Sequence, residues 1–408
     1  MSIFFNTQKY SLSDDINVYC NNEYKSINYS DGDSTEQGIY KIISNVKDLS
    51  VLSTELRDYC DDWPTVYHLG SERANILRPF EDILKGADVL EIGAGCGAIT
   101  RFLGESGANV LAVEGSLRRA KIARARTRDL DNVTVLAEKF ADFETDHKFD
   151  VITLIGVLEY ANLFTSSDTP TQTMLEDVYR YLKPNGKLII AIENQLGLKY
   201  FAGAPEDHKW RVMYGIEGRY TKNDPETFGK KKIQDILHNA NFATQHFFAP
   251  FPDYKTANSI VSEIAYQKPG FNAAAFAIEN TLKDHQLPNH LLFSQEKTWK
   301  VVHDNGLGLE LSNSFLIVAS PERESETAVQ FTQLAFHYST SRIPKFCKQS
   351  HFISDGTGEI KIKTSRLMNI ANRKEINNEL SNIIKEEDVY FRGKSLNEKI
   401  SEIISYYY

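Results

Sequence analysis

The residues whose types and spacing point most directly to chemistry form the glycine-rich segment Glu91-Ile-Gly-Ala-Gly-Cys-Gly97, which follows a short apolar run. Glycines let the backbone turn sharply and approach a ligand where a side chain would collide. The free N–H groups of a following helix would face the same space. The third glycine follows after one intervening residue, whereas a nicotinamide-dinucleotide fingerprint has two. The segment therefore predicts a different ligand site where a strand meets a helix.

Acidic and aromatic residues stand at the ends of the next apolar runs. Glu114 ends the second run, and Ala-Asp-Phe at 141–143 follows the third. Taken singly, such residues have plain structural explanations as a strand end, a helix cap or a turn. Together with 149–152 and the Leu-Lys-Pro-Asn-Gly turn at 182–186, they follow the motif order of class I S-adenosylmethionine-dependent methyltransferases, which this region resembles.

The resemblance implies S-adenosyl-L-methionine as the cofactor and methyl donor. In the family, the acid at the position of Glu114 holds the ribose hydroxyls, and the acid at the position of Asp142 holds the adenine amino group. The donor site that the resemblance implies comprises Glu91, Gly93, Gly95, Gly97, Glu114, Asp142, Phe143 and Ile155. P-loop, H-E-x-x-H and nucleophile-elbow sequences are missing, so phosphoryl transfer and hydrolysis lose their best support.

Residues after the fourth and fifth apolar runs are candidates for binding and activating an acceptor. An alcohol must lose its proton as it attacks, which requires a base or a metal ion that acidifies the hydroxyl. The candidates for catalysis are His208, Asp207, Glu159 and Tyr160, and those for acceptor contacts are Glu193, Asn194, Lys199 and Tyr200. The charges at 206–208 could form a base with its orienting partner or bind a divalent ion, and solvated loop charges are the plain alternative. The prediction assigns no metal.

Short apolar runs alternate with helical stretches from residue 87 onward, which predicts parallel strands with helices on both faces. We predict an α/β fold with a doubly wound, Rossmann-like, seven-stranded and mostly parallel sheet. The predicted boundaries are an N-terminal extension or lid over the donor site at 1–80, a methyltransferase domain at 81–320 with an acceptor loop at 194–227, and a C-terminal appendage or linker to a partner module at 321–408. This last region has the pattern of a helical stretch, a hairpin and a polar helical tail.

The overall composition argues against several classes of protein. The net charge of −9 disfavours nucleic-acid binding, and four scattered cysteines suggest neither a disulfide framework nor a zinc site. No uncharged apolar run has membrane-spanning length. We therefore expect a cytoplasmic protein that is not an integral membrane protein. The basic residues at 118–128 are interpreted as a solvated helix face.

Several longer stretches look like the methyltransferases of bacterial surface-polysaccharide (O-antigen) biosynthesis, often the N-terminal modules of glycosyltransferase polypeptides. They lie at 63–69, 72–79, 192–208, 250–255 and 311–316. The resemblance implies O-methylation of a glycan or nucleotide sugar, with a glycosyltransferase as a further partner. One alternative is an O- or N-methyltransferase of a small metabolite. Another is a non-catalytic donor-binding scaffold beside a glycosyltransferase.

Overall fold

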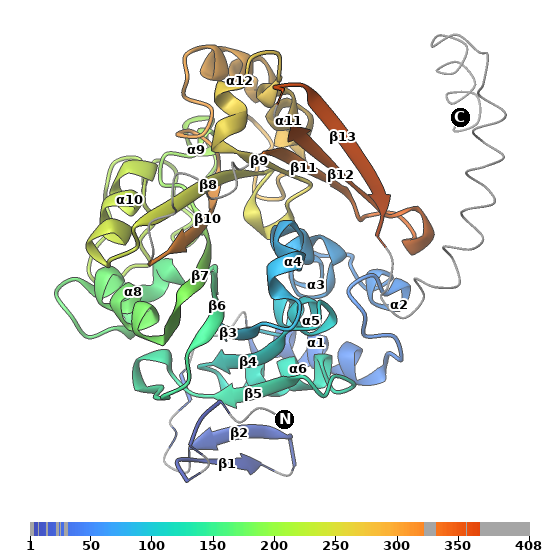
Figure 1. The fold of residues 1–408 in the computed structure, drawn as a ribbon, viewed down its shortest axis with the longest axis vertical. Coiled ribbons are helices and arrows are strands. Elements are labelled where there is room, and N and C mark those ends of the chain that lie inside the picture. The colour runs from blue at the N-terminus through green and yellow to red at the C-terminus, as the bar shows by residue number, and fades with distance from the viewer. Residues whose placement is uncertain are drawn as a thin grey trace. The chain divides into compact units, whose positions relative to one another are not determined.

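A computed structural model describes residues 4–6, 8–13, 15–21, 24, 26–27, 32–321, 332–355 and 357–367. Its strands form one sheet in the order β1-β2-β5-β4-β3-β6-β7-β10-β8-β9-β11-β12-β13 (Figure 1). The strands are β1 (Tyr10–Ser13), β2 (Val18–Asn21), β3 (Asp88–Ile92), β4 (Asn109–Glu114), β5 (Val133–Ala137), β6 (Phe149–Ile155), β7 (Leu182–Glu193), β8 (Thr244–Phe251), β9 (Ser259–Ser262), β10 (Ser314–Ser320), β11 (Gln333–Ser339), β12 (Lys348–Ser354) and β13 (Ile360–Arg366).

Helices connect the strands. The α-helices of the described residues are α1 (Asp33–Asn45), α2 (Thr54–Arg57), α3 (Trp63–Leu69), α4 (Glu81–Leu84), α5 (Ala98–Glu105), α6 (Leu117–Arg126), α7 (Ala161–Phe164), α8 (Pro170–Tyr181), α9 (Leu198–Phe201), α10 (Lys230–Asn239), α11 (Ala273–Asn280) and α12 (Gln295–Asp304). Shorter 3₁₀ turns are η1 (Ser71–Ile76), η2 (Arg78–Phe80), η3 (Phe140–Asp142), η4 (Leu158–Tyr160), η5 (Tyr254–Thr256), η6 (Glu263–Gln267), η7 (Thr281–Lys283) and η8 (Pro344–Phe346). None of these helices is long and apolar enough to cross a membrane.

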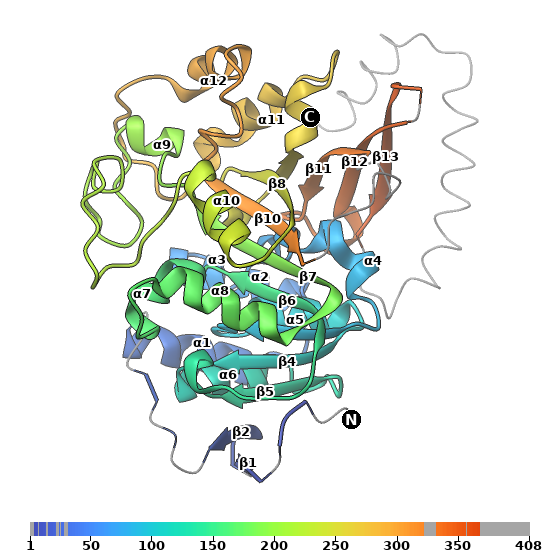
Figure 2. The same cartoon turned by 60° about the vertical axis from the view of Figure 1, so that its left-hand side comes forward.

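The centre of the sheet follows the predicted architecture. Strands β5, β4, β3, β6 and β7 are parallel neighbours, and β10 pairs antiparallel with both β7 and β8. Helices cover both faces of these strands, as the two views show (Figures 1 and 2). The α/β, Rossmann-like prediction is therefore confirmed.

The predicted number of strands is wrong, and so is the prediction that most of them run parallel. It has thirteen strands among the described residues, and it is mixed, because the added strands pair antiparallel with one another. The hairpin of β1 and β2 extends the β5 edge, while β9 and β11–β13 extend the β8 edge. Strand β13 (IKIKTSR) is largely exposed, so it lacks the continuous apolar run by which the central strands were recognised.

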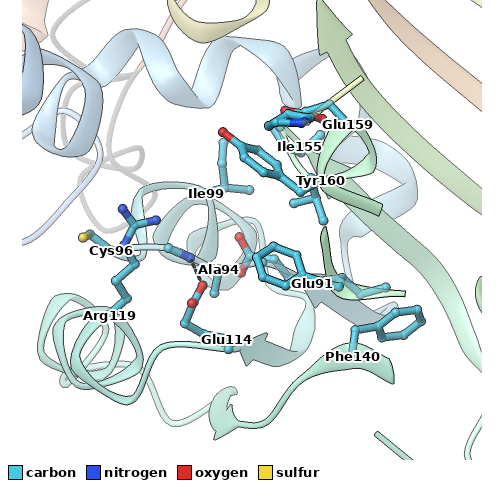
Figure 3. A pocket seen from close by; sticks show the side chains of 18 of the residues that line it. Glu91, Ala94, Cys96, Ile99, Glu114, Arg119, Phe140, Ile155, Glu159 and Tyr160 are labelled. Carbon is cyan, nitrogen blue, oxygen red and sulfur yellow. Dashed lines mark hydrogen bonds between the residues drawn. The ribbon is translucent and has the colours of Figure 1, made fainter. Parts of the chain in front are cut away.

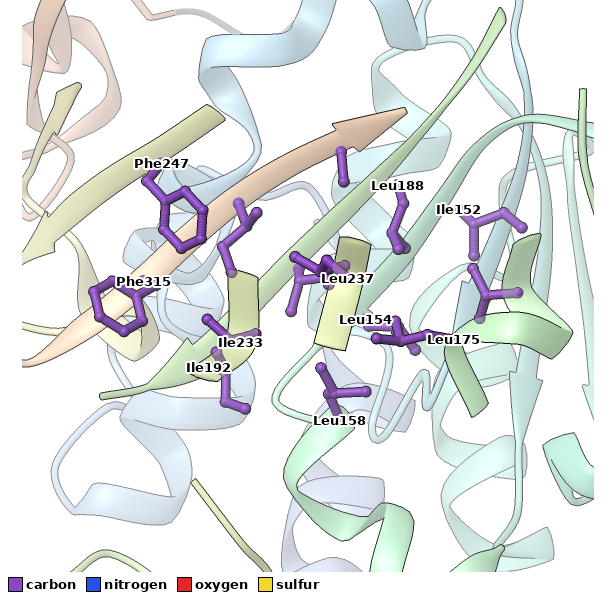
Figure 4. Close-up of a cluster of buried hydrophobic side chains, with 14 of the residues drawn as sticks. Ile152, Leu154, Leu158, Leu175, Leu188, Ile192, Ile233, Leu237, Phe247 and Phe315 are labelled. Atoms are coloured by element: carbon purple, nitrogen blue, oxygen red, sulfur yellow. The ribbon is translucent and has the colours of Figure 1, made fainter. Parts of the chain in front are cut away.

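The central strands are buried on both faces, which explains their apolar sequences. Successive side chains of a strand point to opposite faces. Thus Leu90 joins the core beneath α8 and α10, whereas Val89 joins the core beneath α5 and α6. In the first core, Leu175 of α8 packs with sheet residues such as Leu154 (Figure 4).

The interpretation of the basic residues of α6 as a solvated face is wrong, because α1 packs against this helix. Arg119 is buried, and its Nε lies 2.7 Å from Oε1 of Glu36, which is fully buried in α1. Arg124 is also buried and donates to the carbonyl oxygens of Val133 and Thr127 at 2.8 and 3.0 Å. The pattern of charge alone does not reveal a covering helix some eighty residues earlier.

The predicted domain boundaries stay a prediction. The compact unit that the structure describes runs to Leu367, and β11 joins its sheet by pairing with β9. The expected C-terminal hairpin falls on β12 and β13. The expected polar helical tail lies outside the described residues, as does most of the helical stretch after Pro321.

We expect Leu175→Ala to destabilise the protein by about 2–5 kcal/mol, because it removes a fully buried side chain between α8 and the sheet. Urea unfolding at 25 °C would measure the change. Leu282→Ala is the matched control, since this leucine is 56% exposed, and it should change stability by less than about 0.5 kcal/mol. Equal effects of the two substitutions would contradict the described core.

Candidate functional site

A cavity of about 750 Å³ lies at the carboxyl ends of the parallel strands, where ligands bind in open α/β sheets. Residues at or just beyond the ends of β3, β4, β5, β6 and β7 line it (Figure 3). A further wall comes from α3 and η1, through Trp63, Tyr67, His68 and Arg73. The predicted extension thus contributes directly to the cavity.

Glycine is favoured at the three positions after β3 for different structural reasons. All have positive φ angles, which favour glycine. A Cβ atom on Gly93 would lie 2.5 Å from Cγ2 of Val157, and one on Gly97 would lie 2.7 Å from Cα of Ala123, where α5 meets α6. A Cβ on Gly95 would meet no heavy atom within 4 Å. Gly93 and Gly95 line the cavity, whereas Gly97 packs behind it.

Glu114 fixes the glycine loop. Its buried carboxylate accepts hydrogen bonds from the backbone N–H groups of Gly95 at 2.7 Å and Ser116 at 2.8 Å. Burial raises the pKa of Glu114, and the guanidinium of Arg119 opposes this shift. A carboxylate offers about four acceptor positions, so Glu114 keeps capacity for a ligand diol in the cavity that it lines.

Glu91 contributes a carboxylate oxygen that has no hydrogen-bond partner among the described residues, its Oε2 atom. The side chain is 3% exposed, and burial raises its pKa to about 8. Arg73, also buried, opposes this shift by its charge. The Arg73 guanidinium lies 4.2 Å from the ring centre of Tyr67 and donates to the carbonyl oxygen of Lys255. An acid and a guanidinium therefore stand together at this end of the cavity.

The structure does not bring Asp142 and Phe143 to the cavity. Asp142 is exposed, and Phe143 is buried in the core, where its carbonyl oxygen accepts a hydrogen bond from the Tyr181 hydroxyl at 2.8 Å. The 3₁₀ turn η3 brings Phe140 to the lining instead, and Phe143 stacks on it at 6.5 Å between ring centres. The wall after β5 consists of Glu138, Lys139, Phe140 and Ala141. Ile155, at the end of β6, lines the cavity as predicted.

At the other end of the cavity, the structure brings together four of the predicted residues. Glu159 and Tyr160 lie in η4, Glu193 ends β7, and His208 comes from the loop after α9. The Nε2 atom of His208 lies 3.9 Å from Oε2 of Glu193, and its ring centre lies 5.2 Å from that of Tyr160. Burial raises the pKa of Glu159 well above its usual range, and the charge of Glu193 adds to this. We call Glu159, Glu193 and His208 the acidic cluster.

Asp207 lines the cavity but does not orient His208. Its carboxylate lies 2.9 Å from Nζ of Lys255 and 3.5 Å from Nζ of Lys199, and it accepts a hydrogen bond from the Tyr200 hydroxyl. Burial alone would raise the pKa of Asp207, but the two ammonium groups dominate and lower it. Asp207 is thus an ionised anchor of the loop.

The other predicted acceptor contacts lie behind the cavity wall. Lys199 is fully buried among carboxylates, with Nζ 3.1 Å from Asp253. Tyr200 is buried beside it, and the side-chain amide of Asn194 donates to the carbonyl oxygens of Glu310 and Ser312. None of these three side chains lines the cavity. They support the loop instead of facing a ligand.

Sequence reasoning missed Lys255 and Arg119 as lining residues and gave Arg73 no role. Lys255 contacts both Glu193 and Asp207 from η5, after β8. Its only signal in the sequence is its place at the end of the unusual stretch Pro-Phe-Pro-Asp-Tyr-Lys at 250–255.

The raised pKa of Glu91 makes stability depend on pH. Between about 4.5, its ordinary value, and about 8, the folded protein keeps a proton that the unfolded chain has lost. Stability therefore falls as the pH rises through this window, by at most about 1.4 kcal/mol per pH unit. We expect Glu91→Gln to raise the melting temperature relative to the wild type at pH 8.5 and to lose this advantage near pH 4.5.

Thermal unfolding of both proteins across this pH range would measure the difference. Glu176→Gln, on the exposed side of α8, is the control and should show no such trend. A difference for Glu91→Gln that is the same at every pH would contradict the assignment.

Residues 90–188 match the family model described as a methyltransferase domain. The demethylmenaquinone methyltransferase of Tropheryma whipplei is 32% identical over 108 residues, which cover 26% of this chain and 42% of the relative. The mitochondrial ubiquinone biosynthesis O-methyltransferase of Bos taurus is 23% identical over 62% of this chain and 63% of its own length. The chain thus matches less than two thirds of the length of these curated relatives.

A similar solved structure is phosphoethanolamine N-methyltransferase 2 of Haemonchus contortus, in complex with phosphomonomethylethanolamine and S-adenosylhomocysteine. It is 17% identical, with 71% of this chain and 58% of that chain covered and a TM-score of 0.39. The family match coincides with the strands and the glycine loop that form the cavity. The chain therefore contains a segment, residues 90–188, that matches a methyltransferase domain.

Proposed function

We propose that this chain transfers the methyl group of S-adenosyl-L-methionine to a hydroxyl group of a sugar, in a glycan or nucleotide sugar of bacterial surface-polysaccharide biosynthesis. The observation that carries the proposal is the acidic cluster, which lies in the same cavity as the glycine loop. A donor site and proton-accepting groups thus share one space.

The residues of the glycine-loop end fit the donor. When bound, S-adenosyl-L-methionine supplies an activated methyl group on a positively charged sulfur. The open space beside Gly95 would let the donor approach the protein backbone closely, and Glu114 would hold the ribose hydroxyls. Glu91, with its unpartnered Oε2 atom, suits the ammonium group of the amino-acid end, and Arg73 suits its carboxylate. These residues orient the donor and take no part in bond making.

The acidic cluster would act on the acceptor. Methyl transfer is an in-line displacement in which the acceptor oxygen bonds to the methyl carbon while the carbon–sulfur bond breaks. Alignment of the two substrates supplies much of the acceleration. The acceptor hydroxyl must also give up its proton, and the cluster is the part of the cavity suited to promote this loss. The O-methyltransferase name of the Bos taurus relative supports an oxygen acceptor.

Aromatic side chains support a sugar acceptor. Trp63, Tyr67, Tyr160, Phe164 and Trp210 line the cavity. Trp210 is 68% exposed, which is unusual for so large an apolar side chain. Such rings offer flat apolar faces against which the C–H surface of a sugar can pack. A glycosyltransferase that supplies or consumes the glycan is the partner that we propose with this activity.

A screen would identify the acceptor. The purified chain would be incubated with methyl-labelled donor and either bacterial surface glycans, nucleotide sugars or small phenolic metabolites. We expect label in the carbohydrate samples. Transfer to the phenolic metabolites alone would replace the sugar acceptor with a small metabolite, and binding of the donor without any transfer would favour a scaffold.

We expect Gly95→Arg to abolish donor binding, because the new side chain would fill the open approach to the backbone. Calorimetric titration with S-adenosylmethionine and S-adenosylhomocysteine, with NAD as the control ligand, would measure this. Gly306→Arg is the matched variant, since Gly306 also has a positive φ angle and open space where a Cβ atom would lie, but it stands away from the cavity. Binding that survives in Gly95→Arg, or is lost equally in both variants, would contradict the proposed donor site.

We expect His208→Ala to lower turnover by about 10²–10⁴-fold, the range for a group that assists proton loss. Donor affinity should stay within about twofold of the wild type, because His208 belongs to the acceptor end. Initial rates with labelled donor and calorimetry would test the two parts. His238→Ala, on the exposed side of α10, is the control. Full turnover by His208→Ala would remove His208 from the mechanism.

A further inference from the structure

The acidic cluster combines three potential metal ligands from separate parts of the chain. Glu159, Glu193 and His208 come from η4, the end of β7 and the loop after α9, and each offers one ligand atom within 4.8 Å of those of the other two. Glu159 is 2% exposed, Glu193 is fully buried, and the side chain of His208 is 8% exposed. The cluster is therefore enclosed, and it differs from acidic groups on a surface.

Glu159 Oε2, Glu193 Oε2 and His208 Nε2 have no hydrogen-bond partner among the described residues. A buried polar atom without a partner costs about 1–3 kcal/mol, and more when it is charged. The charge of Glu193 also disfavours ionisation of Glu159. The neighbouring ammonium of Lys255 binds the other oxygen of Glu193, Oε1, so Oε2 is left without a partner. The cluster thus presents three unpartnered atoms that a bound cation would satisfy.

We propose that Glu159, Glu193 and His208 bind one divalent metal ion. Metal–ligand distances near 2.1 Å place two ligands of one ion between about 3.0 Å and about 4.2 Å apart. The 3.9 Å between His208 Nε2 and Glu193 Oε2 falls within this range. Two carboxylates with one imidazole suit a first-row divalent ion such as Mn²⁺, Fe²⁺ or Zn²⁺ and leave coordination positions open. All three residues line the cavity.

Surrounding residues hold the ligands in place, as metal sites require. Lys255 and the Tyr254 hydroxyl bind Oε1 of Glu193, which leaves Oε2 directed toward the cluster. The backbone N–H of His208 donates to Oε2 of Glu206 at 3.0 Å, while Asp207 is anchored by the two buried lysines. The loop is therefore held at Asp207 and at the backbone of His208.

The inferred role of the ion rests on the proposed function. An acceptor hydroxyl that contacts a divalent cation has a lower pKa, so its proton is lost more easily to water in the cavity. Its oxygen then forms the bond to the methyl carbon, and the electron pair of the broken carbon–sulfur bond stays on sulfur. In this arrangement His208 is a ligand of the ion. The loss of turnover expected for His208→Ala is unchanged.

Titration with Mn²⁺ would test the site directly. The full chain would be treated with EDTA, dialysed and titrated, with the free ion followed by electron paramagnetic resonance and the heat by calorimetry. We expect one equivalent to bind to the wild type, and at least tenfold weaker binding by Glu159→Gln and by His208→Asn. Glu176→Gln is the control and should bind Mn²⁺ as the wild type does.

Circular dichroism and donor titration would establish that each variant is folded. No saturable binding of Mn²⁺ by the wild type, or equal binding by all the variants, would overturn the proposal. Neither readout depends on turnover, so the metal site and the proposed activity can fail separately. If methyl transfer persists in EDTA and the protein binds no Mn²⁺, the metal site is contradicted and the proposed activity stands. If the protein binds Mn²⁺ but not the donor, the proposed activity is contradicted and the metal site stands.

Discussion

The contact on which the acceptor end of the cavity depends is the one made by the ammonium group of Lys255. It bridges Glu193 at the end of β7 and Asp207 in the loop after α9. Both carboxylates are buried, and removing one member of a buried ion pair typically costs about 3–5 kcal/mol because the other charge is left without compensation. This lysine therefore holds the loop against the sheet together with Lys199 and Tyr200, which also contact Asp207. The position of His208, one residue beyond Asp207, follows from that contact.

The charges around this contact do not balance. Lys199 and Lys255 lie among Asp207, Asp253, Asp284 and Glu193, so that two ammonium groups face four carboxyl groups. Burial raises the pKa of Asp284, which moderates the excess of negative charge. This end of the cavity is consequently suited to cations and to neutral hydroxyl groups. A nucleotide sugar would have to enter with its sugar first and keep its phosphates away from the cluster.

How much the sequence predicts depends on how local each interaction is. Glu91, Gly95 and Glu114 were recognised because the glycine loop and the next strand end lie within 25 residues and interact with each other. Asp142 and Phe143 were displaced from the cavity because one 3₁₀ turn decides which residue of a short segment faces inward. A sequence motif identifies the strand end but does not determine which residue of the following turn faces the cavity.

Long-range contacts escaped prediction for a related reason. The covering of α6 by α1 joins residues more than eighty positions apart, and Lys255 meets Glu193 from sixty-two positions away. Lys199, Tyr200 and Asn194 belong to a segment that was singled out from the sequence, but whether each side chain faces the cavity or its support depends on partners elsewhere. A hairpin was expected at β12 and β13, but its place in the sheet was not, since β13 is largely exposed and its sequence does not mark it as part of the core sheet.

The two ends of the cavity are therefore built differently, and this bears on how the acceptor is selected. The donor end uses backbone groups of the glycine loop with Glu91 and Glu114, all within one continuous segment of the central sheet, and adds Arg73 from η1. The acceptor end is assembled from η4, the loop after α9 and η5, which are connections between strands. Connections tolerate change better than the strands they join. A different acceptor can thus be accommodated by altering these connections, provided that the contacts of Lys255 with Glu193 and Asp207 are kept.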